Sequence, residues 1–478
     1  MRLEKRLYSR TCLIAIVAIL LNAVSWAAEG KVQTAKYVDY VAELNKLGMA
    51  GRSENLNAAP FYQKAIELYV HWSDEQRKLA TKGWLADLPT REQQLLREWV
   101  QSNSQALSQL ELGSKQPYCW FRLSSRDGTI LSVLTSHLSE YTNLGRAIRV
   151  RAKFSAAEGN MDKAIADVVT YYRCGLHLMG PNKMSNEQLT SIGFRTSAVQ
   201  TAFDILDRTK PNKDLLADLQ RQIEGLFTNE SYIPYFRADK FTKNLMASFA
   251  IFSYIPDFRA DKFTVLDIIQ RIFTDDGKGD GQIDIPSAKK VLLERGAPEK
   301  SLEFMQKLGR RKTIETTEKL YSYLDRIAQK APCQWKTERI DPDPDIATIV
   351  KENPLFYILA NDFFAISLSR RHLERFARCR ADTDGLITTL ALLRYKADKG
   401  QFPDKLDELV SAGYLKALRS DPFSGRPFAY KRAGEDFVLY SFGTNLKDDG
   451  GKLGLNAKGQ PTRWTDEGDM VFWPVLRQ

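Results

Sequence analysis

Residues 386–403 read LITTLALLRYKADKGQFP, and this stretch decides the fold of the C-terminal part of the chain. Apolar residues recur at intervals of three and four, as expected for one face of a helix. Gly400 is the residue type that commonly ends a helix, and Pro403 cannot continue one. The stretch therefore predicts an amphipathic helix with one apolar stripe, made of Leu386, Ile387, Leu390, Leu393 and Ala397.

Two short strands are predicted after this helix. Residues 428–430 and 437–440 are mostly aromatic and aliphatic, and residues 432–435 between them form a turn. Leu406 and Leu409 supply further apolar side chains for the same core. We expect the two strands to pair as a hairpin against the apolar stripe, which gives a compact α+β module.

Three motifs in this region carry a resemblance to a known family. They are YKADKGQFP at 395–403, DPFSG at 421–425 and YSFG at 440–443, followed by acidic stretches at 448–451 and 465–473. Their order resembles the C-terminal globular domain of the type II secretion major pseudopilins, over residues 380–474. The resemblance implies a pseudopilin-like domain at 380–478. A large helical region precedes it in place of a filament-forming helix, so we do not expect a filament subunit.

The pseudopilin resemblance also implies a calcium site, because an acidic loop of that domain holds calcium in the family. Clustered carboxylates repel one another unless a cation neutralises them. Asn445 and Lys447 depart from the acidic step of the family, which leaves the individual ligands open, and a solvated acidic loop is the alternative. The predicted calcium ligands are Asp448, Asp449, Asp466, Glu467 and Asp469.

A second acidic loop, residues 276–287, looks like the start of an EF-hand. Asp276, Asp280 and Asp284 occupy the first, fifth and ninth positions, from which oxygen ligands reach a calcium ion. Lys278 stands where the third position needs an oxygen donor, and Ser287 replaces the bidentate acid of the last position. The prediction is a degenerate EF-hand-like calcium site, and the alternative is a glycine-rich turn without a metal.

Residues 34–340 are predicted to be mainly helical, as an irregular array of helical hairpins; a regular repeat solenoid is the alternative. Residues 156–164 predict a turn between two helices. The sequence SYIPYFRADKFT at 231–242 recurs as SYIPDFRADKFT at 253–264. The aromatic residues of this duplication indicate burial, with a docking surface as the alternative reading.

Residues 341–379 are predicted to join the two parts as a linker and a connecting helix. The acidic, proline-broken residues 340–345 favour an extended segment. Residues 356–368 are strongly apolar and predict a helix packed between the domains. The predicted fold class is therefore mainly α, with a C-terminal α+β module.

The first 27 residues have the pattern of a signal peptide. A basic head precedes the apolar run 13–24, and Ser25-Trp26-Ala27 has the form of a cleavage site. We expect a periplasmic or extracellular protein; an inner-membrane anchor formed by residues 12–28 is the alternative, and would be the one membrane contact. Cleavage would lower the formal charge from +10 to about +7. This excess of positive charge is mild. The sequence has no run of basic residues interspersed with aromatic ones, which is typical of nucleic-acid binding, so no nucleic-acid partner is expected.

Four cysteines remain after cleavage, and an oxidising compartment would allow two disulfides. Cys119 and Cys333 lie in proline-bearing, loop-like surroundings, so we predict that they pair. Cys174 and Cys379 are predicted to be buried helical thiols. The alternative is four free, buried cysteines.

Motifs that carry catalysis are missing from the sequence. The four histidines lack zinc-ligand spacing, and there is no nucleophile elbow, phosphate loop or dinucleotide fingerprint. We therefore expect an exported, non-enzymatic binding or structural protein whose partner is a protein or a cell-surface polymer. One alternative is an exported hydrolase that acts on a polymer with carboxylates in a groove between the helical domain and the C-terminal module. The other is a membrane-tethered secretion accessory protein.

Overall fold

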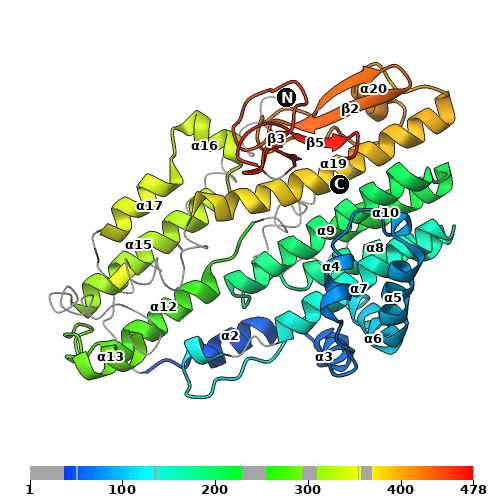
Figure 1. The fold of residues 1–478 in the computed structure, drawn as a ribbon. Helices are drawn as coiled ribbons and strands as arrows, with labels where there is room; N and C mark the ends of the chain where they lie inside the picture. The colour runs from blue at the N-terminus through cyan, green and yellow to red at the C-terminus, as the bar shows by residue number, and fades with distance from the viewer. Residues whose placement is uncertain are drawn as a thin grey trace, which may run out of the picture. The chain divides into compact units, whose positions relative to one another are not determined.

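The computed structural model describes residues 37–49, 52–133, 137–228, 255–292, 309–351, 353, 355–356, 369–463 and 465–476 (Figure 1). The chain divides into two compact units. The small unit contains Ile269–Ile314 and the residues up to Val38, and the large unit contains Asp39–Ile268 and the residues from Glu315 onward. The predicted boundaries at 340 and 380 both fall inside the large unit, so the C-terminal module shares a compact unit with most of the helices.

The first part of the large unit is helical, as predicted. Its elements are α2 (Tyr40–Met49), η1 (Glu54–Leu56), α3 (Ala59–Glu67), α4 (Asp74–Leu79), η2 (Leu85–Asp87), α5 (Thr90–Ser102), α6 (Ser104–Ser114), η3 (Ile130–Ser132), α7 (His137–Ala157), α8 (Met161–Leu176), α9 (Ser185–Thr209) and α10 (Lys213–Thr228). The predicted turn at 156–164 is confirmed, because α7 ends and α8 begins there. The side chain of Asn160 accepts a hydrogen bond from the N–H of Lys163 at 3.2 Å, which caps α8.

Further helices follow from residue 259. They are α12 (Arg259–Ile272), α13 (Ile285–Leu292), α15 (Arg310–Ala328), α16 (Pro332–Glu338), α17 (Pro342–Lys351), α19 (Arg370–Lys399) and α20 (Asp407–Ser411). No helix within the described ranges is both long and apolar enough to cross a membrane. The predicted signal segment, the first copy of the duplication and residues 357–368 of the predicted connecting helix lie outside the described residues.

The predicted extended segment at 340–345 is wrong, because helix α17 begins at Pro342. Proline fits the first turn of a helix, where its missing N–H would have no partner, and Asp343 and Asp345 favour the positive end of the helix dipole. The acidic, proline-rich composition therefore marks a helix start. The N-terminal part of α19 also occupies the range predicted as a linker.

Helix α19 is the predicted amphipathic helix, and it is longer than the sequence pattern indicates. Ser369 caps its start by accepting the N–H of His372 at 3.3 Å. Gly400 ends it with a φ of +80° and donates its N–H to the carbonyl of Lys396 at 2.8 Å. Leu386, Ile387 and Leu390 are fully buried, as predicted, whereas the last stripe residue, Ala397, is exposed.

A three-stranded antiparallel sheet packs on α19 in the order β1-β2-β5 (Figure 1). The predicted hairpin is confirmed as β1 (Ala429–Ala433) and β2 (Asp436–Ser441). Strand β5 (Met470–Trp473) and the small pair β3 (Gly454–Leu455) and β4 (Pro461–Thr462) were not predicted. The module and the helices from α3 to α10 contribute to one continuous apolar core.

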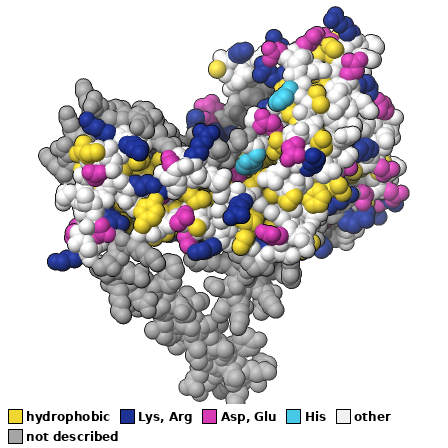
Figure 2. Space-filling view, turned by 90° about the horizontal axis from the view of Figure 1, so that it is seen from below, with side chains coloured by type: hydrophobic (Ala, Val, Ile, Leu, Met, Phe, Trp, Pro, Cys, Tyr) yellow, Lys and Arg dark blue, Asp and Glu magenta, His cyan; other side chains and the backbone are white. Residues whose placement is uncertain are grey.

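Positive and negative side chains are interspersed on one face of the molecule, which Figure 2 shows. Neighbouring residues along helices form ion pairs, such as Lys46 with Glu43 and Arg77 with Asp74, both at 2.6 Å. Exposed pairs of this kind contribute only about 0–1 kcal/mol each, so burial of the core dominates the stability.

Candidate functional site

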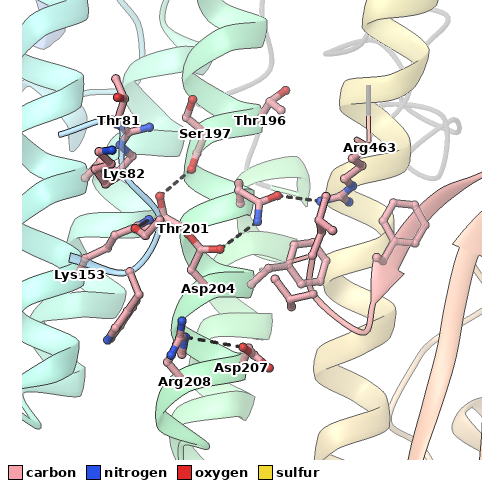
Figure 3. A pocket seen from close by; sticks show the side chains of 18 of the residues that line it. Thr81, Lys82, Lys153, Thr196, Ser197, Thr201, Asp204, Asp207, Arg208 and Arg463 are labelled. Atoms are coloured by element: carbon pink, nitrogen blue, oxygen red, sulfur yellow. Dashed lines mark hydrogen bonds and ion pairs between the residues drawn. The ribbon is translucent and has the colours of Figure 1, made fainter. Parts of the chain in front are cut away.

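A cavity of about 250 Å³ lies inside the large unit, where the helices meet the C-terminal module. Helices α7 and α9 form two of its walls, the loop 81–84 forms a third, and residues around β4 and β5 close it (Figure 3). Concave sites between separately formed elements are common locations for ligands. This cavity is the candidate functional site.

Helix α9 supplies the polar wall. Ser197, Thr201, Asp204 and Arg208 recur at intervals of three and four, so their side chains lie on one face of the helix (Figure 3). The hydroxyl of Thr201 donates to the carbonyl of Ser197 at 2.7 Å. The opposite side of α9 packs on other helices, which fixes this row of polar groups toward the cavity.

Arg463 follows β4 and connects three elements at the cavity wall. Its Nη1 donates to Oε1 of Gln200 on α9 at 3.1 Å, and its Nη2 lies 2.6 Å from Oδ1 of Asp382 on α19. The guanidinium lies beside the stacked rings of Phe203 and Phe472, with its carbon 5.1 and 5.0 Å from their centroids. Its Nε has no hydrogen-bond partner among the described residues.

Burial shifts the pKa values of both members of this ion pair. The carboxylate of Asp382 is 1% exposed, and burial raises its pKa to about 6, although the positive charges of Arg463 and Arg378 oppose the shift. Burial also lowers the pKa of Arg463, which Asp382 partly offsets. The two residues therefore form a desolvated ion pair at the edge of the cavity.

Lys153 on α7 is a second buried cation. It is 7% exposed, its Nζ lies 2.6 Å from Oδ2 of Asp204, and it donates to the carbonyl of Gly83 at 2.8 Å. Burial lowers the pKa of Lys153, and the negative charge of Asp204 offsets only part of this shift. The Nε2 of Gln200 donates to Oδ1 of Asp204 at 2.9 Å. Lys153, Asp204, Gln200 and Arg463 thus form one network from α7 through α9 to β4.

The remaining charges leave the cavity with a positive surplus. Arg208 pairs with Asp87 at 3.0 Å and lies 3.9 Å from Asp207. Arg149 donates to the carbonyl of Ala80 at 2.5 Å, and neither it nor Lys82 forms an ion pair with any residue that the structure describes. The cavity therefore suits a negatively charged group better than a positive one.

Asp204 and Asp207 are the acidic side chains of the cavity wall, one turn apart on α9. A hydrolase of the paired-carboxylate type needs one protonated acid beside one ionised carboxylate. Here the Nζ of Lys153 lies 2.6 Å from Asp204, and Arg208 lies 3.9 Å from Asp207. Each of the two carboxylates therefore already has a cationic neighbour.

The predicted calcium ligands of the C-terminal loop form two groups. Asp448, Asp449 and Asp469 lie close together. The buried carboxylate of Asp469 accepts the N–H of Asp449 at 3.3 Å and of Gly451 at 2.7 Å. Burial, and then the charges of Asp449 and Asp448, raise the pKa of Asp469 to about 6. A cation beside these three would relieve that repulsion.

Asp466 and Glu467 lie elsewhere, in an open hollow beside the start of α19. Asp466 pairs with Arg371 at 2.6 Å and with Arg378 at 3.2 Å, so arginine already neutralises this carboxylate. No three His, Cys, Asp or Glu side chains in the described ranges are arranged to hold a metal ion. A calcium ion at Asp469 would therefore need backbone carbonyl ligands as well, and the five-residue set does not form one site.

The carboxylates of the EF-hand-like loop bind the loop's own backbone. Asp276 accepts the N–H groups of Lys278 and Asp280, at 2.8 and 2.9 Å. Asp280 accepts the N–H groups of Gly281 and Arg311, at 2.9 and 3.1 Å. These hydrogen bonds lower the pKa values of Asp276 and Asp280.

Asp284, the third predicted ligand of that loop, accepts the N–H of Ser287 at 3.2 Å in the first turn of α13. The three carboxylates thus stabilise a turn and a helix start. Calcium binding by this loop stays a prediction.

All four cysteines described are free thiols. Cys333 lies beside Gly425 of the C-terminal module, whereas Cys119 is buried near Cys174 in the helical core, so the predicted Cys119–Cys333 disulfide is not formed. Cys174 and Cys379 are buried on helices, as predicted. Burial raises the pKa of Cys119 to about 12 and of Cys174 to about 11, so neither thiol is a nucleophile at neutral pH.

Two of the histidines are buried and neutral. The Nδ1 of His177 lies 2.6 Å from the hydroxyl of Tyr62, its Nε2 lies 3.0 Å from the carbonyl of Gln116, and burial lowers its pKa to about 3. His372 is packed against the rings of Phe258 and Phe376, and burial lowers its pKa to about 3 as well. These surroundings favour packing roles over proton transfer near neutral pH.

Comparison of the chain with protein-family models, with curated proteins and with solved structures finds no match. The pseudopilin resemblance therefore depends on the C-terminal motifs. The candidate site is assigned from its geometry alone.

Proposed function

We propose that this protein is an exported, non-enzymatic binding protein whose ligand occupies the cavity between α9 and the C-terminal module. The observation that carries the proposal is the cavity itself. Groups from the helices and from the module converge on it, and its buried charges are fixed by the network of Lys153, Asp204, Gln200 and Arg463. Such preorganised polar groups in a partly apolar hollow are typical of ligand sites.

A hydrolase is the main competitor, and a turnover assay separates the two. The protein lacking residues 1–27 is incubated with polysaccharide and peptide polymers, and released reducing ends and amino groups are measured. The proposal predicts no release beyond the buffer control. Release that disappears in the Asp204→Asn, Asp207→Asn double variant would establish a hydrolase that uses this cavity.

Export and calcium belong to the same proposal. We infer that residues 1–27 are removed and that calcium stabilises the C-terminal module through Asp448, Asp449 and Asp469. The predicted cleavage site and the raised pKa of Asp469 support these two steps. Intact mass measurement of the protein from the soluble envelope fraction tests the first, and a chain that starts at Ala28 is expected. A full-length chain found in the membrane fraction would support the tethered alternative.

A further inference from the structure

The cavity contains hydrogen-bond donors and positive charges that the protein does not use. The Nε–H of Arg463 is buried and has no hydrogen-bond acceptor in the described part of the chain. Arg149 has one carbonyl as its partner, and Lys82 is exposed at the rim. Leaving a buried donor without an acceptor is unfavourable. A ligand oxygen that filled this place would recover that cost.

The charge expected of a ligand follows from the ion pairs that the cavity residues already form. Asp382 offsets Arg463, Asp204 offsets Lys153, and Asp87 offsets Arg208. Arg149 and Lys82 then remain, and Asp207 is the one further acid among the described lining residues. A single negative charge on a ligand would balance this set. A neutral ligand would leave the excess positive charge of the cavity uncompensated.

The size and the apolar walls restrict the ligand further. The volume of about 250 Å³ lies below the usual range for drug-sized ligands, which is roughly 300–1,000 Å³. Phe203, Phe472 and Val475 line the cavity beside the polar wall. The occupant would therefore be small, with apolar atoms that contact these residues and one charged group.

On the basis of the proposed function, we propose that the cavity binds a small organic oxyanion, in which a carboxylate or phosphate group meets Arg149, Lys82 and Arg463. Carboxylate and phosphate share the oxygen acceptors that a guanidinium recognises. The occupied cavity would join the helices and the module through the ligand as well as through Arg463.

Isothermal titration with three probes tests this inference: sodium hexanoate, hexanol with the same apolar chain and no charge, and inorganic phosphate. Hexanoate is expected to bind at least roughly tenfold more tightly than hexanol, because hydrogen bonds between oppositely charged groups are stronger than those to a neutral hydroxyl. Inorganic phosphate that displaces hexanoate would show that the site accepts both headgroups. Hexanoate binding without displacement would assign a carboxylate.

Matched variants locate the binding. Lys82→Met and Arg149→Met should each weaken hexanoate binding by roughly tenfold. Arg146→Met is the control, since Arg146 lies one turn away on α7, stacks on Trp72 at 5.4 Å and does not line the cavity. It should change the affinity less than twofold on the same scale. Circular dichroism of each variant confirms that it is folded.

The outcomes that overturn the inference are distinct from those that overturn the proposed function. Equal binding of hexanol and hexanoate, lost in Arg149→Met, would keep the cavity as a ligand site and reject the oxyanion. Failure of hexanoate and phosphate alike to bind the folded protein would also reject it. Polymer turnover lost in Asp204→Asn, Asp207→Asn would reject the binding function itself.

Discussion

Arg463 shows why a single buried charge can decide how two parts of a protein meet. Its guanidinium contacts Asp382, Gln200 and two aromatic rings, so α9, α19 and the module share one residue. A buried ion pair contributes little compared with an apolar replacement, but removing one member leaves an uncompensated charge. We therefore expect the pair to help fix how the module docks on the helices.

Replacing Arg463 with Met should lower the free energy of unfolding by about 3–5 kcal/mol, because Asp382 is left buried and unpaired. Urea denaturation of the single variant gives this value. The double variant Arg463→Met, Asp382→Leu removes both charges and should recover part of the loss. Equal instability of the single and double variants would show that the ion pair is not the cause.

Asp261 gives a pH dependence that can be isolated. Burial raises its folded-state pKa from 3.8 to about 6, although the N–H of Ser185 donates to it at 3.4 Å. The folded protein therefore binds this proton more tightly than the unfolded chain. The contribution of Asp261 to stability should rise as the pH falls from about 6 to about 4.

Asp261→Asn removes this titration, so its unfolding free energy should depend less on pH over that interval. The measurement is urea denaturation of wild type and variant at several pH values. Curves that stay parallel from pH 6 to pH 4 would contradict the raised pKa of Asp261.

At the scale of elements, α19 and the sheet illustrate what sequence patterns reveal. The stripe at 386–393 and the hairpin were predicted because apolar periodicity and turn residues are local signals. Strand β5 was missed because residues 470–473, MVFW, are buried on every position and show no alternation. The start of α17 was misread because proline and aspartate serve helix starts and turns alike.

The residues of the candidate site were not predicted, for a different physical reason; the sequence suggested only a groove between the helical domain and the C-terminal module, as part of the hydrolase alternative. The residues of the site come from α7, α9, the loop 81–84 and the segments around β4 and β5, and no spacing in the sequence joins them. One signal was present: Asp382 and Asp384 precede an apolar stretch of a helix, where charged side chains need partners. The partners themselves, Arg463 and Arg419, became visible only in three dimensions.

The contact between α19 and β5 depends on the absence of a side chain at Gly385. A Cβ at this position would lie 2.7 Å from the ring of Phe472. Gly385→Ala should therefore displace the sheet and destabilise the protein by roughly 1–3 kcal/mol. Gly193 on α9 is a matched control, since a Cβ there meets no atom within 4 Å. Gly193→Ala should stabilise by roughly 0.5–1 kcal/mol in thermal unfolding. Equal effects at both positions would contradict the close packing.

At the scale of the whole molecule, calcium distinguishes the two acidic loops. If calcium binds beside Asp448 and Asp469, millimolar calcium should raise the melting temperature of the wild type, because binding to the folded state alone stabilises it. The increase should be lost in Asp448→Ala and kept in Asp276→Ala. Differential scanning calorimetry with calcium or EDTA provides the comparison.

Loss of the response in Asp276→Ala alone would place calcium in the EF-hand-like loop. An unchanged melting temperature in the wild type would reject a stabilising role for calcium in both loops.

The central claim is that the helices and the C-terminal module form one unit, joined at Arg463 and at the cavity beside it. Native-state hydrogen exchange in increasing urea tests it most directly, by comparing peptides from α9 (Ser185–Thr209) and β2 (Asp436–Ser441). The two peptides should lose protection together, with the same free energy of opening. Loss of protection in β2 at a lower urea concentration, while α9 stays protected, would show that the module opens independently and would contradict the account.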